Sequence, residues 1–154
     1  MEGHVVSVER VIGAPPSAIF AVLADANRHP EIDGSGSVIK TKAGTPEALS
    51  LGSTFGMSMK MGVPYSMSNT VVEFEPDHVI AWQTVFSGFF GRYIGGRIWR
   101  YELEEVPGGT KVTETWDISQ DKQGFFLKRG KLPTATAESM SKTLERLAQA
   151  VESS

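Results

Sequence analysis

The feature that most constrains the fold is a long run of short strands and turns that ends in one helical stripe. Residues 37–119 divide into six segments of alternating, β-branched or aromatic residues, with glycine- and proline-bearing turns between them. From Lys131 to Ser154 the apolar residues recur instead at three- and four-residue steps. Such a chain is expected to bury one face of an antiparallel sheet against the final helix.

The residues before this run add one strand and two short helices. Residues 4–13 predict the strand, and residues 14–25 predict a helix that begins at Pro16, where the missing N–H costs nothing. Asn27 is a candidate cap for a second, very short helix. The predicted fold class is α+β, in the order β-α-α-β6-α, with a seven-stranded curved antiparallel sheet wrapped around a long C-terminal helix. A sheet curved in this way often leaves an internal cavity.

Composition narrows the classes of partner. The chain has 154 residues, the size of one ordinary domain, and we assign residues 1–154 to a single domain. A net charge of −3 gives no reason to expect nucleic acid or an anionic membrane as a partner. The absence of cysteine excludes disulfides and thiol nucleophiles and fits a cytoplasmic location. No apolar run is long enough for stable membrane insertion.

Five strings carry a family resemblance: VERVIGAPPSAIFAVLAD (8–25), HPEIDGSG (29–36), NTVVEFEPDHVIAW (69–82), IWRYELEEVPGGTKVTETWDIS (98–119) and MSKTLERLAQAV (140–151). Together they cover nearly the whole chain. They resemble the SRPBCC superfamily, also called the START-like or helix-grip fold, and within it the polyketide cyclase/dehydrase-like branch. The resemblance implies a ligand cavity between sheet and C-terminal helix. It implies no particular reaction, because this fold hosts lipid carriers, hormone sensors and cyclases alike.

Strand connectivity predicts which loops meet at one end of the sheet. If consecutive strands pair antiparallel, loops 87–96 and 120–130 and the segment 29–36 lie at the same end, which we call the rim. The rim would gather the apolar residues Val63, Tyr65, Phe89, Phe90, Phe125 and Phe126. We interpret them as a lid over a hydrophobic pocket. The alternative is that they close the end of an ordinary core.

Alternation along the strands predicts the residues that line the pocket. The inward candidates on the strands are Met57, Met59, Met61, Trp82, Phe86, Trp99, Tyr101, Val112 and Trp116. From the helical stripe we add Met140 and Leu144. Methionine side chains adapt to ligands of varied shape, although they also fill gaps in ordinary cores.

One carboxylate interrupts the apolar face. Glu114 falls in phase with Val112 and Trp116, so its side chain is expected to point inward, where it must be paired, protonated or hydrogen-bonded. Asn69 is a second candidate for an inward polar group. Glu114, with Tyr101 or Asn69, would hold a ligand's polar group or act as a general acid/base. The alternative is an internal ion pair, for example with Arg97.

The string HPEIDGSG has two interpretations. Its glycines Gly34 and Gly36 permit a sharp exit into the next strand, which makes the string a structural corner. As a polar lip at the rim, His29 or Asp33 would touch a ligand's polar group. The spacing of His29, Glu31 and Asp33 matches no closed ligand set, so we predict no metal site. A basic cluster, Lys122, Lys128, Arg129 and Lys131, is a solvated loop or a site for an anionic ligand group.

Three functions follow as alternatives. The first is binding or transport of a small hydrophobic molecule, such as a lipid, polyketide or isoprenoid-like compound. The second is an enzyme of cyclase or dehydratase type, with Glu114, Tyr101 and Asp33 as candidate proton-transfer residues and Glu31 as a further one. The third is a protein-interaction module. No cofactor is predicted, and the chain is expected to be a monomer or homodimer.

Overall fold

The structure is a computed structural model that describes residues 4–34, 38–41, 48–61, 63–86, 95–128 and 130–152. The side chains of residues 38–41, 57–61, 63–65 and 126 lie outside that description as well. The elements in chain order are β1 (Val5–Ile12), α1 (Pro16–Leu23), the 3₁₀ helix η1 (Ala26–Arg28), α2 (His29–Ile32), β2 (Val38–Thr41), β3 (Thr54–Met61), β4 (Val63–Glu75), β5 (Val79–Phe86), β6 (Gly95–Val106), β7 (Gly109–Asp117), α3 (Gly124–Leu127) and α4 (Leu132–Glu152).

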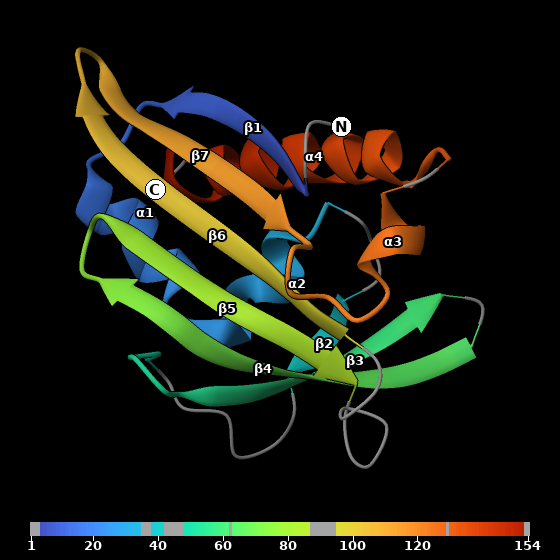
Figure 1. The fold of residues 1–154 in the computed structure, drawn as a ribbon. Helices are drawn as coiled ribbons and strands as arrows, with labels where there is room; N and C mark the ends of the chain where they lie inside the picture. Colours follow the sequence, from blue (N-terminus) through green and yellow to red (C-terminus); the bar gives the residue numbers. More distant parts are fainter. Residues whose placement is uncertain are drawn as a thin grey trace.

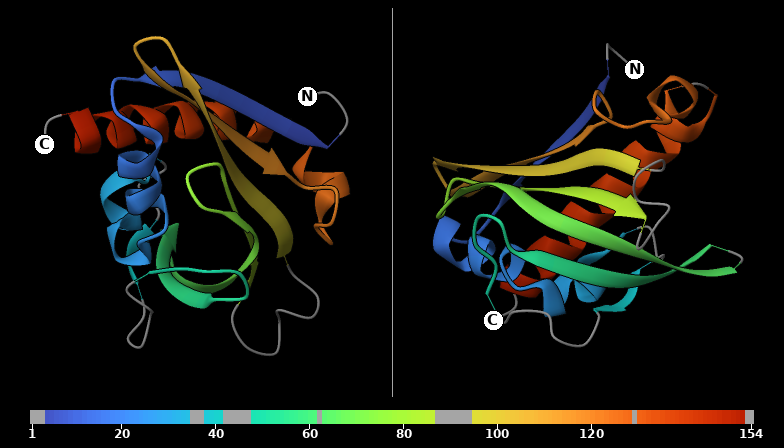
Figure 2. Two further views of the ribbon diagram at one scale, coloured as in Figure 1. Left: turned by 90° about the vertical axis from the view of Figure 1, so that its left-hand side faces the viewer. Right: turned by 60° about the horizontal axis from the view of Figure 1, so that its bottom comes forward.

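The strands form one antiparallel sheet in the order β1-β7-β6-β5-β4-β3-β2. The sheet curves, and α4 crosses its concave face while α1 and α2 lie beside one end of α4 (Figures 1 and 2). The predicted α+β fold with a curved antiparallel sheet and a long C-terminal helix is confirmed. Because every neighbouring pair is antiparallel, the start of β2 and the end of β7 lie at the same end of the sheet, as the rim prediction required.

Local sequence explains where the main elements begin and turn. Helix α1 begins at Pro16, as predicted, because a proline at this position removes only an N–H that has no helical partner. The turn between β6 and β7 uses Gly108 and Gly109 with φ of 90° and 152°, values that L side chains rarely adopt. A Cβ at Gly109 would also lie 2.9 Å from the backbone carbon of Ile12, so this turn packs directly on the end of β1.

Two details of the prediction were wrong. The predicted loop 120–130 contains a short helix, α3, whose four residues carry no periodic signal of their own. The cap before the second helix is Asp25 rather than Asn27: the Asp25 carboxylate accepts a hydrogen bond from the Asn27 backbone N–H at 3.1 Å. A carboxylate one residue before the helix satisfies an N–H that would otherwise lack a partner.

The chain just after α2 is held against α4 by a close backbone approach at Gly34. The Gly34 N–H donates to Thr143 Oγ1 at 2.9 Å, and Arg146 Nη1 donates to the Asp33 carbonyl at 2.5 Å. A Cβ at Gly34 would lie 2.6 Å from both the Lys142 Cβ and the Thr143 backbone nitrogen. Glycine is needed here to let the chain touch the helix. Gly36 lies outside the described residues.

The substitution Gly34→Ala is therefore expected to destabilise the fold by about 1–3 kcal/mol, because the added methyl group has no space against α4. The measurement is urea unfolding at neutral pH. Gly13→Ala is the matched control, since a Cβ there meets only the flexible end of Glu152 within 3.9 Å. Equal losses for the two variants would contradict the argument from close packing.

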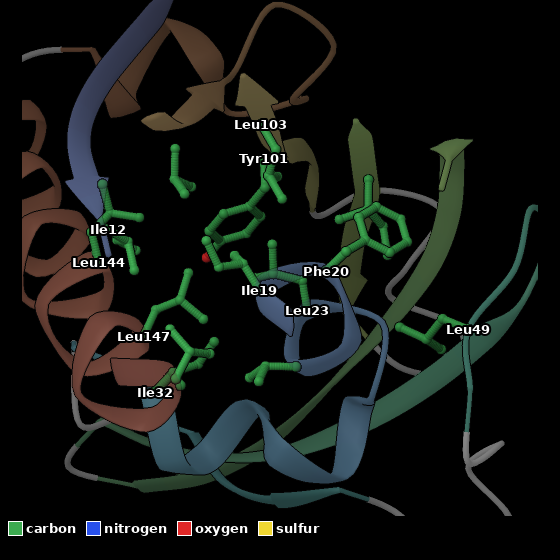
Figure 3. Packing of buried hydrophobic residues seen from close by; sticks show 14 of the residues in the cluster. Ile12, Ile19, Phe20, Leu23, Ile32, Leu49, Tyr101, Leu103, Leu144 and Leu147 are labelled. Carbon is green, nitrogen blue, oxygen red and sulfur yellow. The ribbon is translucent and has the colours of Figure 1, made fainter. Parts of the chain in front are cut away.

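The core lies between α4, α1 and the concave face of the sheet. Ile12, Ile19, Leu23, Tyr101, Leu144 and Leu147 belong to one buried cluster (Figure 3). A smaller buried group, Trp116, Ile118 and Met140, continues toward the end of the sheet where β7 finishes. The apolar stripe predicted for the C-terminal helix therefore faces the sheet, as its spacing indicated.

Candidate functional site

The polar centre of the interior is a pair formed by Glu114 on β7 and Tyr101 on β6. The two residues are direct partners across the strands, so their side chains lie on the same face of the sheet. The Tyr101 hydroxyl donates a hydrogen bond to Glu114 Oε2 at 2.9 Å. Glu114 is 2% exposed and Tyr101 is 4% exposed. The inward orientation that alternation predicted for both side chains is thus observed.

Only half of the Glu114 carboxyl group is used by the protein. Among the residues that the structure describes, Glu114 Oε1 is the one buried side-chain nitrogen or oxygen with no hydrogen-bond partner. Native proteins pair nearly all such atoms, and an exception calls for a physical explanation. A ligand atom that completes the hydrogen bond is one such explanation.

Burial keeps this carboxyl group protonated near neutral pH. Removal from water raises the pKa of Glu114 from 4.5 to about 8; the hydrogen bond from Tyr101 lowers it, and the charge of Asp33 raises it further. Burial also raises the pKa of Tyr101 well above 10, with a further contribution from Glu114. Both groups are therefore mainly neutral hydrogen-bonding groups at pH 7.

The surroundings of the pair are apolar. In Figure 3 the Tyr101 side chain points from β6 into the interior, toward Ile19 of α1 and toward Leu144 and Leu147 of α4. On the other side of Glu114, Val8 of β1 is its direct partner across the strands. Carbon atoms from the sheet and two helices thus surround one polar pair, which is the usual composition of a site for a small organic molecule.

The ion pair considered between Arg97 and Glu114 is wrong. Arg97 Nε instead donates to Asp121 Oδ2 at 3.0 Å, and the Asp121 side chain is buried. Asp121 lies in the segment between β7 and α3, which folds back over β6 so that Gly96 packs under the Gln120 carbonyl. The partner of Arg97 is therefore supplied by a turn, and this leaves Glu114 with Tyr101 as its hydrogen-bonding partner.

His29 does not form the polar lip that one interpretation of HPEIDGSG proposed. The residue is 6% exposed, its ring stacks on Trp82 with centroids 4.8 Å apart, and its Nε2–H donates to the Leu23 carbonyl at 2.8 Å. Burial lowers the pKa of His29, so the ring is neutral at pH 7. Glu31 points away from it, exposed and paired with Arg28 at 3.2 Å. For residues 29–34 these contacts favour the interpretation as a structural corner, and residues 35 and 36 lie outside the described residues.

Asn69 is buried, as predicted, but it belongs to an internal network. Thr84 Oγ1 donates to Asn69 Oδ1 at 2.6 Å, and Asn69 Nδ2 donates to the Phe55 carbonyl at 3.3 Å. These bonds join β3, β4 and β5. The principal role visible for Asn69 is to hold neighbouring strands together.

The other predicted ligand residues fall into three groups. Trp82, Trp116, Met140 and Leu144 are buried, Trp99 and Phe86 are half-buried, and Phe125 on α3 is 57% exposed. Phe89 and Phe90 lie outside the described residues, as do the side chains of Met57, Met59, Met61, Tyr65 and Phe126. The lid over a pocket therefore stays a prediction.

Sequence reasoning missed the contribution of the short helices to the interior. Ile19 and Leu23 of α1 and Ile32 of α2 are all buried. The apolar spacing of Ile19 and Leu23 was visible, but nothing local indicated that they face Tyr101. A surface hollow of about 350 Å³ lies elsewhere, and its lining includes the charged residues Glu75, Glu102 and Lys111. That composition does not suit a hydrophobic ligand.

Two further observations bear on other kinds of site. In the described ranges, no three histidine or acidic side chains converge in a way that would hold a metal ion. No helix in that part of the chain is both long and apolar enough to cross a lipid bilayer.

Comparison with known proteins assigns the family. Residues 3–152 match the family described as polyketide cyclase / dehydrase and lipid transport. The chain belongs to this family. Together with the solved structures described below, the match also confirms the resemblance to the SRPBCC superfamily.

A curated relative is similar in sequence to part of this chain. An uncharacterized protein of Mycobacterium tuberculosis, Rv0088, is 36% identical over 108 residues, which are 69% of this chain and 44% of that protein. The chain thus spans less than half the length of the curated relative that it matches.

Solved structures share the fold at low identity. Protein NE0264 of Nitrosomonas europaea gives a TM-score of 0.72 at 14% identity, with 97% of this chain and 95% of that chain covered. Protein MLL2253 of Mesorhizobium loti gives a TM-score of 0.69 at 15% identity, with 97% of this chain and 98% of that chain covered. DynU16, from the dynemicin biosynthetic locus, gives a TM-score of 0.68 at 15% identity, with 97% of this chain and 48% of that chain covered. These likenesses show the fold alone.

Proposed function

We propose that this protein binds a small hydrophobic molecule, such as a lipid, polyketide or isoprenoid-like compound, between the concave face of the sheet and α4. The observation that carries the proposal is the buried Glu114 Oε1 atom, which has no hydrogen-bond partner among the described residues and lies in apolar surroundings. A polar ligand atom at this position would satisfy it, while the ligand's carbon skeleton would lie against the residues of α1 and α4.

The family supports this proposal at a coarser level. Its description joins polyketide cyclases and dehydrases with lipid transport, and both activities require an apolar site that accepts a molecule with a few polar groups. DynU16 shares the fold and comes from a biosynthetic locus, which fits a role in handling natural-product intermediates. Transport between sites and storage of a ligand are both consistent with such binding.

An enzymatic role is the second candidate, and the pKa of Glu114 favours it. A carboxyl group with a pKa of about 8 is poised to give and take protons near neutral pH, as general acid/base chemistry requires. Tyr101 would orient the carboxyl group through Oε2, and Asp33 would contribute to its high pKa. The third alternative, an interaction module, stays a prediction, as do the cytoplasmic location and the oligomeric state.

Native mass spectrometry of the protein purified from its own host tests the binding proposal. We expect a mass excess that corresponds to one small molecule and that disappears on denaturation. Glu102→Gln is the matched control variant, because Glu102 neighbours Tyr101 on β6 but is exposed on the opposite face. It should carry the same molecule. A wild-type protein that has only the mass of the chain and binds no apolar probe would overturn the proposal.

The substitution Glu114→Gln separates binding from catalysis. Glutamine keeps the size and hydrogen-bonding capacity of the side chain but cannot exchange a proton at neutral pH. If Glu114 is the acid/base, turnover of a polyketide-like substrate should fall about 100-fold or more while binding persists. Turnover that survives in the glutamine variant would exclude Glu114 from this role and leave the binding function in place.

A further inference from the structure

The unpartnered atom Glu114 Oε1 also restricts the chemistry of the ligand. The Tyr101 hydroxyl donates to Oε2, and the carbonyl oxygen of a neutral carboxyl group is its better acceptor, so we assign the carboxyl proton to Oε1. Oε1 is therefore a buried O–H donor with no acceptor among the described residues. Such a group calls for an acceptor atom, and a second donor in its place would leave both groups unsatisfied.

The charged groups near the pair also favour an uncharged ligand group. The groups that shift the pKa of Glu114 are Tyr101 on β6 and Asp33 just after α2, and no described lysine or arginine is among them. Arg97 is paired with Asp121, and Arg146 donates to the Asp33 carbonyl. The buried side chains of α4 are all uncharged: Pro133, Met140, Thr143, Leu144, Leu147, Ala148 and Val151. A buried anion would find no compensating cation here.

We infer that the polar group of the ligand is a neutral hydrogen-bond acceptor, such as a ketone, ester or quinone carbonyl oxygen, which accepts the proton of Glu114 Oε1. The inference rests on the proposed function and specifies its substrate class. It excludes ligands whose buried end is a carboxylate, such as fatty acids, because the charge of Asp33 opposes a second negative charge and no described cation near the pair would compensate it. The site thus selects among hydrophobic molecules by the polar group that they bury.

A series of probes with one carbon skeleton tests this selection. The probes are 2-acetylnaphthalene, 2-ethylnaphthalene and 2-naphthoate, and their affinities for the full chain are measured by calorimetry at pH 6.5 and pH 9. At pH 6.5 we expect the ketone to bind about tenfold more tightly than the ethyl compound, which lacks the acceptor. The carboxylate should bind more weakly than either. At pH 9 the preference for the ketone should largely disappear, because Glu114 loses its proton.

Two variants at one position provide matched controls. Glu114→Gln offers an amide N–H donor at every pH, so it should retain the preference for the ketone at both pH values. Glu114→Met has a similar size but no donor, so it should bind the ketone and the ethyl compound equally. Glu102→Gln on the opposite face should behave like the wild type. Circular dichroism establishes that each variant is folded, and the wild-type probe series decides the question even if the methionine variant does not fold.

The outcomes distinguish this inference from the proposed function. Equal wild-type binding of the ketone and the ethyl compound, or tightest binding of the carboxylate, would overturn the inference and leave hydrophobic binding intact. A co-purifying molecule with a buried carboxylate and no other acceptor would do the same. If neither a probe nor a co-purifying molecule is bound, the proposed function itself fails.

Discussion

Glu114→Gln is expected to stabilise the folded protein by an amount that grows as the pH rises from 5 to 9. The pKa of Glu114 is about 8 in the folded chain and 4.5 in the unfolded chain. Below pH 4.5 both states hold the proton, and the group has no net effect. Between 4.5 and 8 the unfolded chain releases the proton while the folded chain retains it, which costs the wild type about 1.4 kcal/mol per pH unit.

Over this pH range the difference in unfolding free energy between the variant and the wild type should grow by roughly 3–5 kcal/mol. Glutamine is neutral throughout and still accepts the hydrogen bond from Tyr101. Urea unfolding of both proteins at pH 5, 7 and 9 provides the measurement, because the titration of all other groups cancels in the difference. For Glu102→Gln, on the exposed face, the unfolding free energy should change with pH in parallel with that of the wild type. If the Glu114→Gln curve is also parallel, the carboxyl group is not buried in its neutral form.

Leu147→Ala is expected to cost about 2–5 kcal/mol of unfolding free energy. Leu147 is fully buried on α4 and belongs to the same cluster as Tyr101 (Figure 3). Removal of three carbon atoms there leaves a cavity that the sheet and α1 fill only in part, since interiors are packed as densely as organic crystals. Chemical denaturation at pH 7 measures the loss.

Leu132→Ala on the same helix is the matched control. Leu132 is 41% exposed, so its truncation should change the unfolding free energy by no more than about 0.5 kcal/mol. If both variants lose the same stability, α4 is not anchored to the sheet by its buried stripe. The interior site would then lack the helix that forms one of its walls.

The interior pair was predictable because it depends on short-range geometry. Residues 97–106 and 111–119 alternate, and the tight turn at residues 107–110 determines how they pair. Tyr101 and Glu114 therefore had to lie on one face, opposite each other, and the apolar phase of Val112 and Trp116 indicated which face was buried. The hydrogen bond at 2.9 Å between them is a consequence of that register.

The partners that come from distant turns and helices were not predictable in the same way. Arg97 shares a face with Trp99, which made Glu114 a reasonable partner, but the segment after β7 returns over β6 and supplies Asp121 instead. His29 was a candidate for a polar lip at the rim, but its ring stacks on Trp82 in the folded chain. A local pattern records spacing along the chain and contains no information about which loop folds back over which strand.

The sequence by itself thus determined the family, the antiparallel sheet with its C-terminal helix, and the inward position of Glu114, because strand alternation and helical spacing act within a few residues. Only the tertiary structure decided the state of that carboxyl group. Its protonation depends on the water excluded by α1, α4 and β1 and on the charge of Asp33, and these elements are distant in sequence. The acid/base and hydrogen-bonding properties of Glu114 therefore depend on its burial by elements that meet only in the folded chain.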